Sequence, residues 1–288
     1  MNAMNLPTAA GAVRAELGYI RHPSTRPINY MYDPPPGVEK ENCVYDFRRV
    51  QIEDARRHGA ASSVHREGFE LRIAPSEVSD FHDEEQIRRI YHAECAQLAC
   101  AATGGSHAIV FDHLLRQREA GRPSLTFGRH GDGRHPGSVG RVHNDYSDES
   151  GQRRLGLVLQ DAAAVAAVRR FCIVNIWRSL AGPVLDTPLA VCDSRSVLPG
   201  DSVAGEVRYT HRTGEIYLYE YSSQHRWYYH PGMDRHEALV FKQYDSQRAG
   251  VARFTPHAAF DLPHIPEGAP LRQSIEVRCL VLFDPIAK

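Results

Sequence analysis

Three side chains in this sequence have the types and the spacing of a metal site: His143, Asp145 and His257. His143 and Asp145 stand two positions apart, and residues i and i+2 of an extended segment point to the same side of the backbone. Both can therefore reach one ion while Asn144, between them, points away. Two histidines and one carboxylate on a metal with other positions open describe a non-haem iron(II) site that activates oxygen.

Other histidines compete for these roles. His82 and His92 each have a carboxylate two positions further on, but both lie in a segment with helical spacing. On a helix, residues i and i+2 do not face the same way. His264 lies between two prolines shortly after His257, in what reads as a loop. It remains an alternative to His257 as the distal ligand.

The elements that must position these side chains read as a series of short strands. Segments rich in β-branched and aromatic residues alternate with Gly, Pro, Ser and Asp, which is typical of a β-meander. One strand is predicted before His143, over residues 108–115, and a loop over 125–141 leads from it to His143. The strands expected afterwards cover residues 171–177, 188–192, 215–221, 226–229, 238–244 and 274–283.

This order resembles the double-stranded β-helix of iron(II)/2-oxoglutarate oxygenases. In that fold H-x-D follows an early strand, the distal histidine opens the penultimate strand, and a basic residue opens the last one. The intervals along the chain between Asp145, His257 and Arg272 fall within what that superfamily accommodates. The resemblance implies a mainly β fold with flanking helices, in which a jelly-roll, cupin-like core carries an N-terminal α/β extension.

Longer motifs are spread over most of the chain. They are NIWR at 175–178, PLAVCDSRS at 188–196, WYY at 227–229, EALVFK at 237–242 and RQSIEVR at 272–278. Together they resemble the AsaB/CmcJ-like hydroxylase/desaturase family of iron(II)/2-oxoglutarate-dependent oxygenases, and the set is far more specific than any one motif. Membership implies iron-dependent oxidation of a small molecule in specialised metabolism.

The resemblance also implies a site for the co-substrate 2-oxoglutarate beside Fe(II) and O2. Arg272 would hold its far carboxylate, because a guanidinium fork matches two carboxylate oxygens and the hydroxyl of Ser274 adds a third hydrogen bond. Arg278 lies on the same strand face by alternation and is the rival for this role. Arg178, near a strand end, is a further candidate, with an ion pair to an aspartate as the alternative.

Four more residues are candidates for contact with the substrate. Asn144 and Tyr146 flank the metal pair. Arg116, near the end of a predicted inner strand, could bind the co-substrate or an anionic substrate, or pair with an aspartate. Trp227 could line a pocket, although an aromatic cluster in a strand more often belongs to the core.

The first half of the chain reads as a cap on this core. Residues 1–42 are rich in Pro and polar groups and are expected to wrap the surface, and residues 43–52 and 69–73 read as two short strands that could pair. Apolar residues at helical spacing between 81 and 98 predict an amphipathic helix that ends at Gly104. We expect one oxygenase domain over 1–288, with 1–105 as extension and cap helix and 106–288 as the double-stranded β-helix core.

Composition is that of a soluble enzyme with a small-molecule substrate. The formal net charge is −1, with no long block of like charge, which argues against nucleic acid and anionic membrane surfaces as partners. No run approaches the roughly 20 apolar residues of a membrane span. Six scattered cysteines without a C-x-x-C pair are compatible with reduced thiols, so we expect a cytoplasmic protein. A homo-oligomer is compatible with the sequence.

The expected reaction is hydroxylation or desaturation of a small molecule, with 2-oxoglutarate converted to succinate and CO2. Asp145 disfavours halogenation, which needs that metal position for chloride. Two alternatives stay open. One is a cupin-type metal enzyme that does not use 2-oxoglutarate, and the other is a non-catalytic or partner-dependent helper of a biosynthetic enzyme with the same fold.

Overall fold

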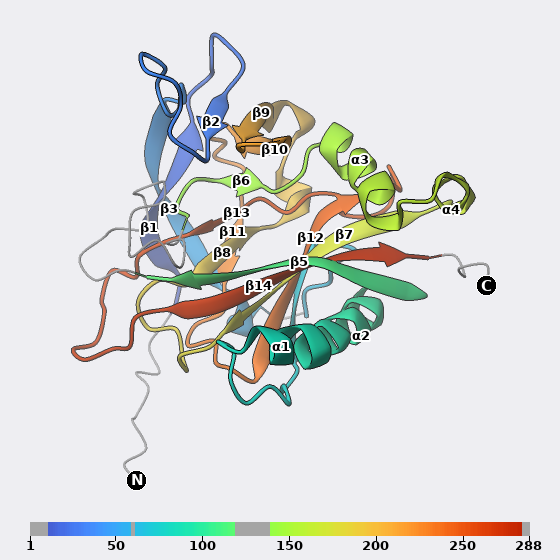
Figure 1. Ribbon diagram of the computed structural model, residues 1–288. Coiled ribbons are helices and arrows are strands. Elements are labelled where there is room, and N and C mark those ends of the chain that lie inside the picture. Colours follow the sequence, from blue (N-terminus) through green and yellow to red (C-terminus); the bar gives the residue numbers. More distant parts are fainter. Residues whose placement is uncertain (1–10, 59–60, 119–138, 284–288) are drawn as a thin grey trace.

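The computed structural model describes residues 11–58, 61–118 and 139–283. Its strands are β1 (Val13–Ile20), β2 (Ile28–Tyr30), β3 (Tyr45–Asp54), β4 (Phe69–Ile73), β5 (His107–Gln117), β6 (His143–Asn144), β7 (Phe171–Ser179), β8 (Leu189–Cys192), β9 (Ser202–Arg208), β10 (Thr213–Tyr219), β11 (Trp227–Tyr229), β12 (Glu237–Asp245), β13 (His257–Ala259) and β14 (Gln273–Leu282). They form two sheets (Figure 1).

The larger sheet has nine strands in the order β1-β3-β11-β8-β13-β6-β10-β9-β2. It curls back on itself, because Gly18 of β1 bridges to Arg141 just before β6. The concave side of this curl holds its own apolar cluster, which includes Leu17, Tyr19 and Trp227. His143 and His257 lie on the opposite side, where the ring of His257 contacts Phe241 of the second sheet.

The smaller sheet is antiparallel, with the order β4-β12-β7-β14-β5. Every residue of β7 and β12 is buried, so these central strands are covered on both faces. Register shifts mark one bulge at Gln243 in β12 and a second at Phe111 in β5, opposite Arg278 and Cys279 of β14. A bulge re-aims the neighbouring side chain, and both bulges lie at or beside residues that contact Asp145.

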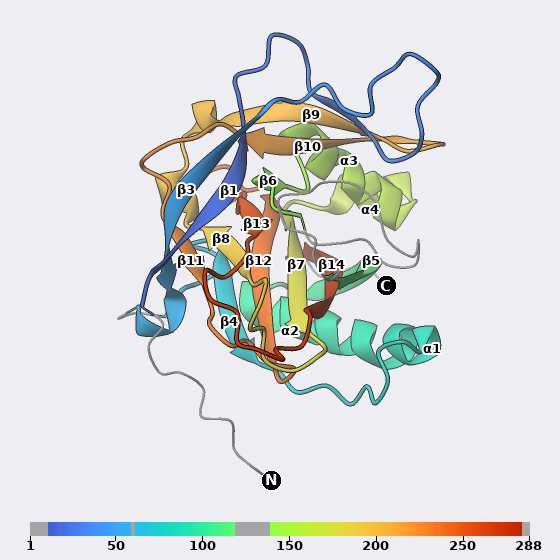
Figure 2. The ribbon, with the colours of Figure 1, turned by 90° about the vertical axis from the view of Figure 1, so that its left-hand side faces the viewer.

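Helices cover the outer face of the five-stranded sheet, below it in both views (Figures 1 and 2). The segment begins with α1 (Glu84–Gln86), continues through the single π-helical turn η2 (Ile87–Tyr91) and ends with α2 (His92–Thr103). Asp83 caps its start by accepting from the next amides, and Gly104, at φ 70°, ends it in the left-handed conformation that suits glycine.

The remaining helices are short. α3 (Asp148–Leu159) follows the H-x-D segment directly and is capped by Ser147, whose hydroxyl accepts from the amide of Ser150. This cap turns the chain away from the site immediately after Asp145. The others are α4 (Ala162–Ala167), η1 (Ala55–Arg57), η3 (Ser194–Ser196) and η4 (Pro199–Asp201).

The expected mainly β fold with flanking helices is confirmed, and every strand predicted between 108 and 283 is present within a few residues. Most of the loop expected over 125–141 lies outside the described residues. The surface wrap expected for residues 1–42 is wrong over 13–20, because β1 pairs with β3 along its whole length. Segments 43–52 and 69–73 do not pair with each other, since β3 and β4 belong to different sheets.

Candidate metal centre

His143, Asp145 and His257 converge between the two sheets. His143 and His257 are direct cross-strand partners in β6 and β13, which places both rings on the same sheet face. Their centroids are 4.3 Å apart, and Nε2 of His143 is 3.6 Å from Oδ1 of Asp145. One ligand atom from each residue lies within 4.8 Å of the other two, a spacing that one ion can bridge.

Backbone carbonyls orient both imidazoles. Nδ1 of His143 is 2.8 Å from the carbonyl of Arg141, and Nδ1 of His257 is 3.2 Å from the carbonyl of Thr255. A carbonyl only accepts, so each Nδ1 donates and each Nε2 keeps its lone pair for a metal, the usual arrangement of metal-binding histidines. Burial, and then repulsion from His257, holds the pKa of His143 well below its ordinary value, which keeps that ring neutral.

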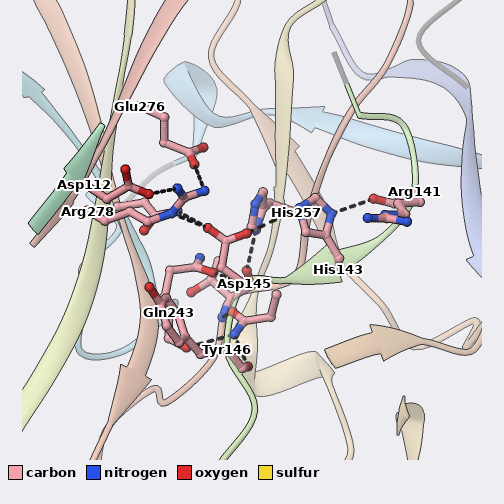
Figure 3. Close-up of polar contacts among 12 residues, drawn as sticks. Asp112, Arg141, His143, Asp145, Tyr146, Gln243, His257, Glu276 and Arg278 are labelled. Carbon is pink, nitrogen blue, oxygen red and sulfur yellow. Dashed lines mark hydrogen bonds and ion pairs between the residues drawn. The ribbon is translucent and has the colours of Figure 1, made fainter. Parts of the chain in front are cut away.

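Asp145 is held from the five-stranded sheet (Figure 3). Its Oδ2 accepts from Nδ2 of Asn175 at 2.9 Å and from Nε of Arg278 at 3.0 Å, while its amide donates to Oε1 of Gln243 at 2.8 Å. Burial alone would raise the pKa of Asp145, but the positive charge of Arg278 outweighs it, and that pKa lies far below its usual range. The carboxylate is therefore ionised and fixed in place.

A small cavity adjoins the two imidazoles and contains two arginines, Arg116 and Arg272. Arg272 is 3% exposed, donates from Nη1 to the carbonyl of Thr187, and lies over the ring of Trp177. Burial, and then repulsion from Arg116, lowers the pKa of Arg272 to about 10. Two cations that repel each other in a buried pocket favour binding of an anion.

Two polar atoms beside this cavity fit a carboxylate ligand. Nε of Arg272 and Oγ of Ser274 are buried and have no hydrogen-bond partner in the described part of the chain. A buried donor without a partner is costly, and such atoms commonly mark ligand sites. The cavity itself measures about 20 Å³, so a five-carbon diacid has to displace side chains that line it.

Arg278 and Arg178 do not join Arg272 in this cavity. Arg278 lies against Asp145 and also donates to Asp112 and Glu276. Arg178 is on the opposite face of the sheet, where Nε donates to the hydroxyl of Tyr91 and Nη1 to a backbone carbonyl. The expectation that Arg178 binds the co-substrate is therefore wrong, because alternation along β7 directs it away from the site.

Three of the four candidate substrate contacts are also placed elsewhere. Trp227 belongs to the cluster inside the curl of the nine-stranded sheet and donates to the hydroxyl of Tyr19. Asn144 is fully buried and bonded to backbone groups of three other residues. Tyr146 is 5% exposed and packs in an apolar cluster. These three do not line the cavity at the metal site, whereas Arg116 does.

Asn175 and Gln243 are the site residues that sequence reasoning missed. Each is an amide inside a strand whose residues are all buried. A buried amide needs partners, and this was the available signal. The sequence could not show that Asp145 is the partner of both, because that depends on the register of two sheets.

Comparison with known proteins agrees with this geometry. Residues 17–282 match the family described as "Oxidoreductase/YMDC permease-like domain". The hydroxylase/desaturase efuI of Hormonema carpetanum is 30% identical over 264 residues, which cover 83% of this chain and 85% of that protein. The hydroxylase/desaturase CTB9 of Cercospora beticola is 31% identical over 261 residues, with 83% and 78% covered.

A solved structure shares the fold. The iron and alpha-ketoglutarate-dependent endoperoxidase NvfI superposes with a TM-score of 0.81 at 24% identity, over 96% of this chain and 100% of the other. No helix among the described residues is long and apolar enough to cross a bilayer. From its sequence relatives, its motifs and the convergent His-Asp-His site, this chain belongs to the hydroxylase/desaturase family of iron(II)/2-oxoglutarate-dependent oxygenases.

Proposed function

We propose that His143, Asp145 and His257 hold iron(II) in this enzyme, and that Arg272 and Ser274 bind the far carboxylate of 2-oxoglutarate. The observation that carries the proposal is the convergence of three ligand atoms within 4.8 Å, with both Nε2 atoms free and the carboxylate ionised. The unpartnered Nε of Arg272 and Oγ of Ser274 support the second half. Arg116 provides additional positive charge in the same cavity.

When bound, iron(II) supplies the activation of dioxygen that allows a C–H bond to be oxidised while 2-oxoglutarate is converted to succinate and CO2. The protein chain itself orients the metal ligands. The carbonyls of Arg141 and Thr255 fix the two rings, and Phe241 packs edge-on against His257 with centroids 4.9 Å apart. Burial of His143 and His257 keeps bulk water away from the metal face.

The substrate is a small molecule of specialised metabolism, and the outcome is hydroxylation or desaturation. This part of the proposal rests on the relatives, which are named as hydroxylase/desaturases and dioxygenases. We also propose that residues 1–288 form one oxygenase domain, supported by β3 and β4 of the extension pairing with β11 and β12 of the core. A cytoplasmic location fits a requirement for reduced iron and 2-oxoglutarate.

The proposal is tested by adding iron(II) and 2-oxoglutarate to the metal-free protein, first without oxygen. We expect a visible charge-transfer absorption that needs both additions, because the keto acid gives this band only when it binds the iron. Admission of oxygen should then release succinate. A cupin-type enzyme would show no dependence on the keto acid, and a helper protein would form no succinate alone; either result would reject the proposal.

A further inference from the structure

Three polar residues lie in one row across the five-stranded sheet. Arg278 of β14 is the register partner of Asn175 in β7 on one side and of Asp112 in β5 on the other. The bulge in β5, at Phe111, lies directly beside this row. The side chain of Arg278 points toward Asp145 (Figure 3), and the side chain of Asn175 donates to the same carboxylate.

The two oxygens of Asp145 have different surroundings. Oδ2 accepts two hydrogen bonds, from Asn175 at 2.9 Å and from Arg278 at 3.0 Å. A carboxylate oxygen has about two lone-pair sites, so both sites of Oδ2 are occupied. Oδ1 is the atom that lies 3.6 Å from Nε2 of His143. The carboxylate therefore presents one oxygen to the metal face and one to the sheet.

Arg278 is itself held firmly. Besides Asp145, it donates from Nη1 to Asp112 at 2.6 Å and from Nη2 to Glu276 at 3.0 Å. A planar guanidinium with three carboxylate partners in three directions has little freedom to rotate. Glu276 lines the cavity with Arg272, whereas Arg278 is not among the cavity residues. The two arginines of the RQSIEVR motif therefore have different surroundings: Arg272 lines the cavity, and Arg278 contacts the carboxylates of the protein itself.

We infer that Arg278 and Asn175 are positioning residues that occupy Oδ2 of Asp145 with hydrogen bonds, so that Asp145 binds the metal through Oδ1 alone. The inference rests on the proposed function, and it explains why Asn175, Arg278 and Asp112 lie in one row beside the metal site. A carboxylate that binds through both oxygens would occupy one more metal position. With two histidines and a chelating keto acid also bound to a six-coordinate ion, no position would then remain for dioxygen.

The variant Arg278→Met tests this role with cobalt(II), whose absorption bands report the coordination number without any turnover. We expect the Kd for cobalt(II) to rise about 10- to 100-fold, as is typical for loss of an outer partner of a metal ligand. The cobalt bands should also change shape. The Kd for 2-oxoglutarate on the metal-saturated protein should stay close to the wild-type value.

Arg272→Met should give the reverse pattern. Its cobalt spectrum should match that of the wild type, while the Kd for 2-oxoglutarate rises about 10- to 100-fold with loss of a charged hydrogen-bond donor. Arg178→Met is the matched control for removal of a buried arginine from the same sheet. It should unfold at a lower temperature and keep both the cobalt spectrum and the 2-oxoglutarate affinity.

Arg278→Met leaves Asp112 and Glu276 without their shared cation, so Arg278→Lys and Asn175→Ala are measured beside it. Arg278→Lys keeps the charge and should recover part of the cobalt affinity, and Asn175→Ala should change the cobalt bands in the same direction as Arg278→Met. The inference is overturned if the folded variants keep the wild-type cobalt spectrum, or if Arg278→Met loses 2-oxoglutarate affinity as Arg272→Met does. Failure of the proposed function would look different, since wild-type protein would then bind cobalt no better than His257→Ala.

Discussion

The two faces of the five-stranded sheet bury the same kinds of side chain for different purposes. Along β7, Asn175 and Trp177 lie on the inner face of the sheet, toward the metal site. Val174, Ile176 and Arg178 lie on its outer face, toward the helical layer. All five are buried. Burial alone therefore does not separate a binding residue from a structural one on this sheet.

Hydrogen bonding does separate them, as the two buried arginines Arg272 and Arg178 show. Arg178 has partners in the hydroxyl of Tyr91 and the carbonyl of Arg235, so the fold uses its charge locally. Arg272 keeps an unpartnered Nε beside the unpartnered hydroxyl of Ser274. Unsatisfied polar atoms on the inner face are available to a ligand, whereas the polar groups of Arg178 stabilise the packing of helix on sheet.

The largest effect is expected on the inner face, from His257→Ala. Loss of a metal ligand should weaken iron(II) binding by more than the ~100-fold upper range for an outer partner, and succinate formation should fall to background. Iron(II) titration and succinate assay measure both. His264→Ala is the control, because His264 is exposed and should leave both values unchanged. Equal loss in the two variants would reject His257 as the distal ligand.

A smaller effect of a different kind is expected on the outer face, from Tyr91→Phe. The change removes the hydroxyl that accepts from Nε of Arg178 and leaves a buried charged donor without that partner. We expect the free energy of unfolding to fall by about 1–3 kcal/mol. Urea unfolding measures this change. The affinities for iron(II) and 2-oxoglutarate should not change, and a clear change in either would mean that the two faces are coupled.

Much of the site could be predicted from sequence because its signals are local. The same-side geometry of His143 and Asp145 follows from alternation in an extended segment. The motif around Arg272 and Ser274 is also contiguous. The strands from β5 onward are apolar runs bounded by turn residues, so their positions were found as well.

The remainder depends on how distant segments pair. Alternation places Arg178 opposite Asn175, but it does not say which face of β7 meets the metal site. The β1 segment, VRAELGYI, does alternate apolar and polar residues, but the sequence does not show that it pairs with β3 or that the curl of the large sheet buries Leu17 and Tyr19. Gln243 reaches the amide of Asp145 from a bulge, and bulges leave no clear mark in a single sequence.

The smallest effect is expected from Ser274→Ala. This variant distinguishes a ligand-binding residue of the inner face from a structural residue most directly. The hydroxyl of Ser274 is buried without a hydrogen-bond partner among the described residues, so the alanine leaves no other group unpaired. The free energy of unfolding should therefore stay the same or rise. The Kd for 2-oxoglutarate should rise about tenfold, since one hydrogen bond to a carboxylate is lost. Equilibrium unfolding and anaerobic titration measure the two quantities on the same sample. A structural serine would give the opposite pattern, with lower stability and unchanged affinity, because the cost of an unpaired group appears in the fold and not in the ligand.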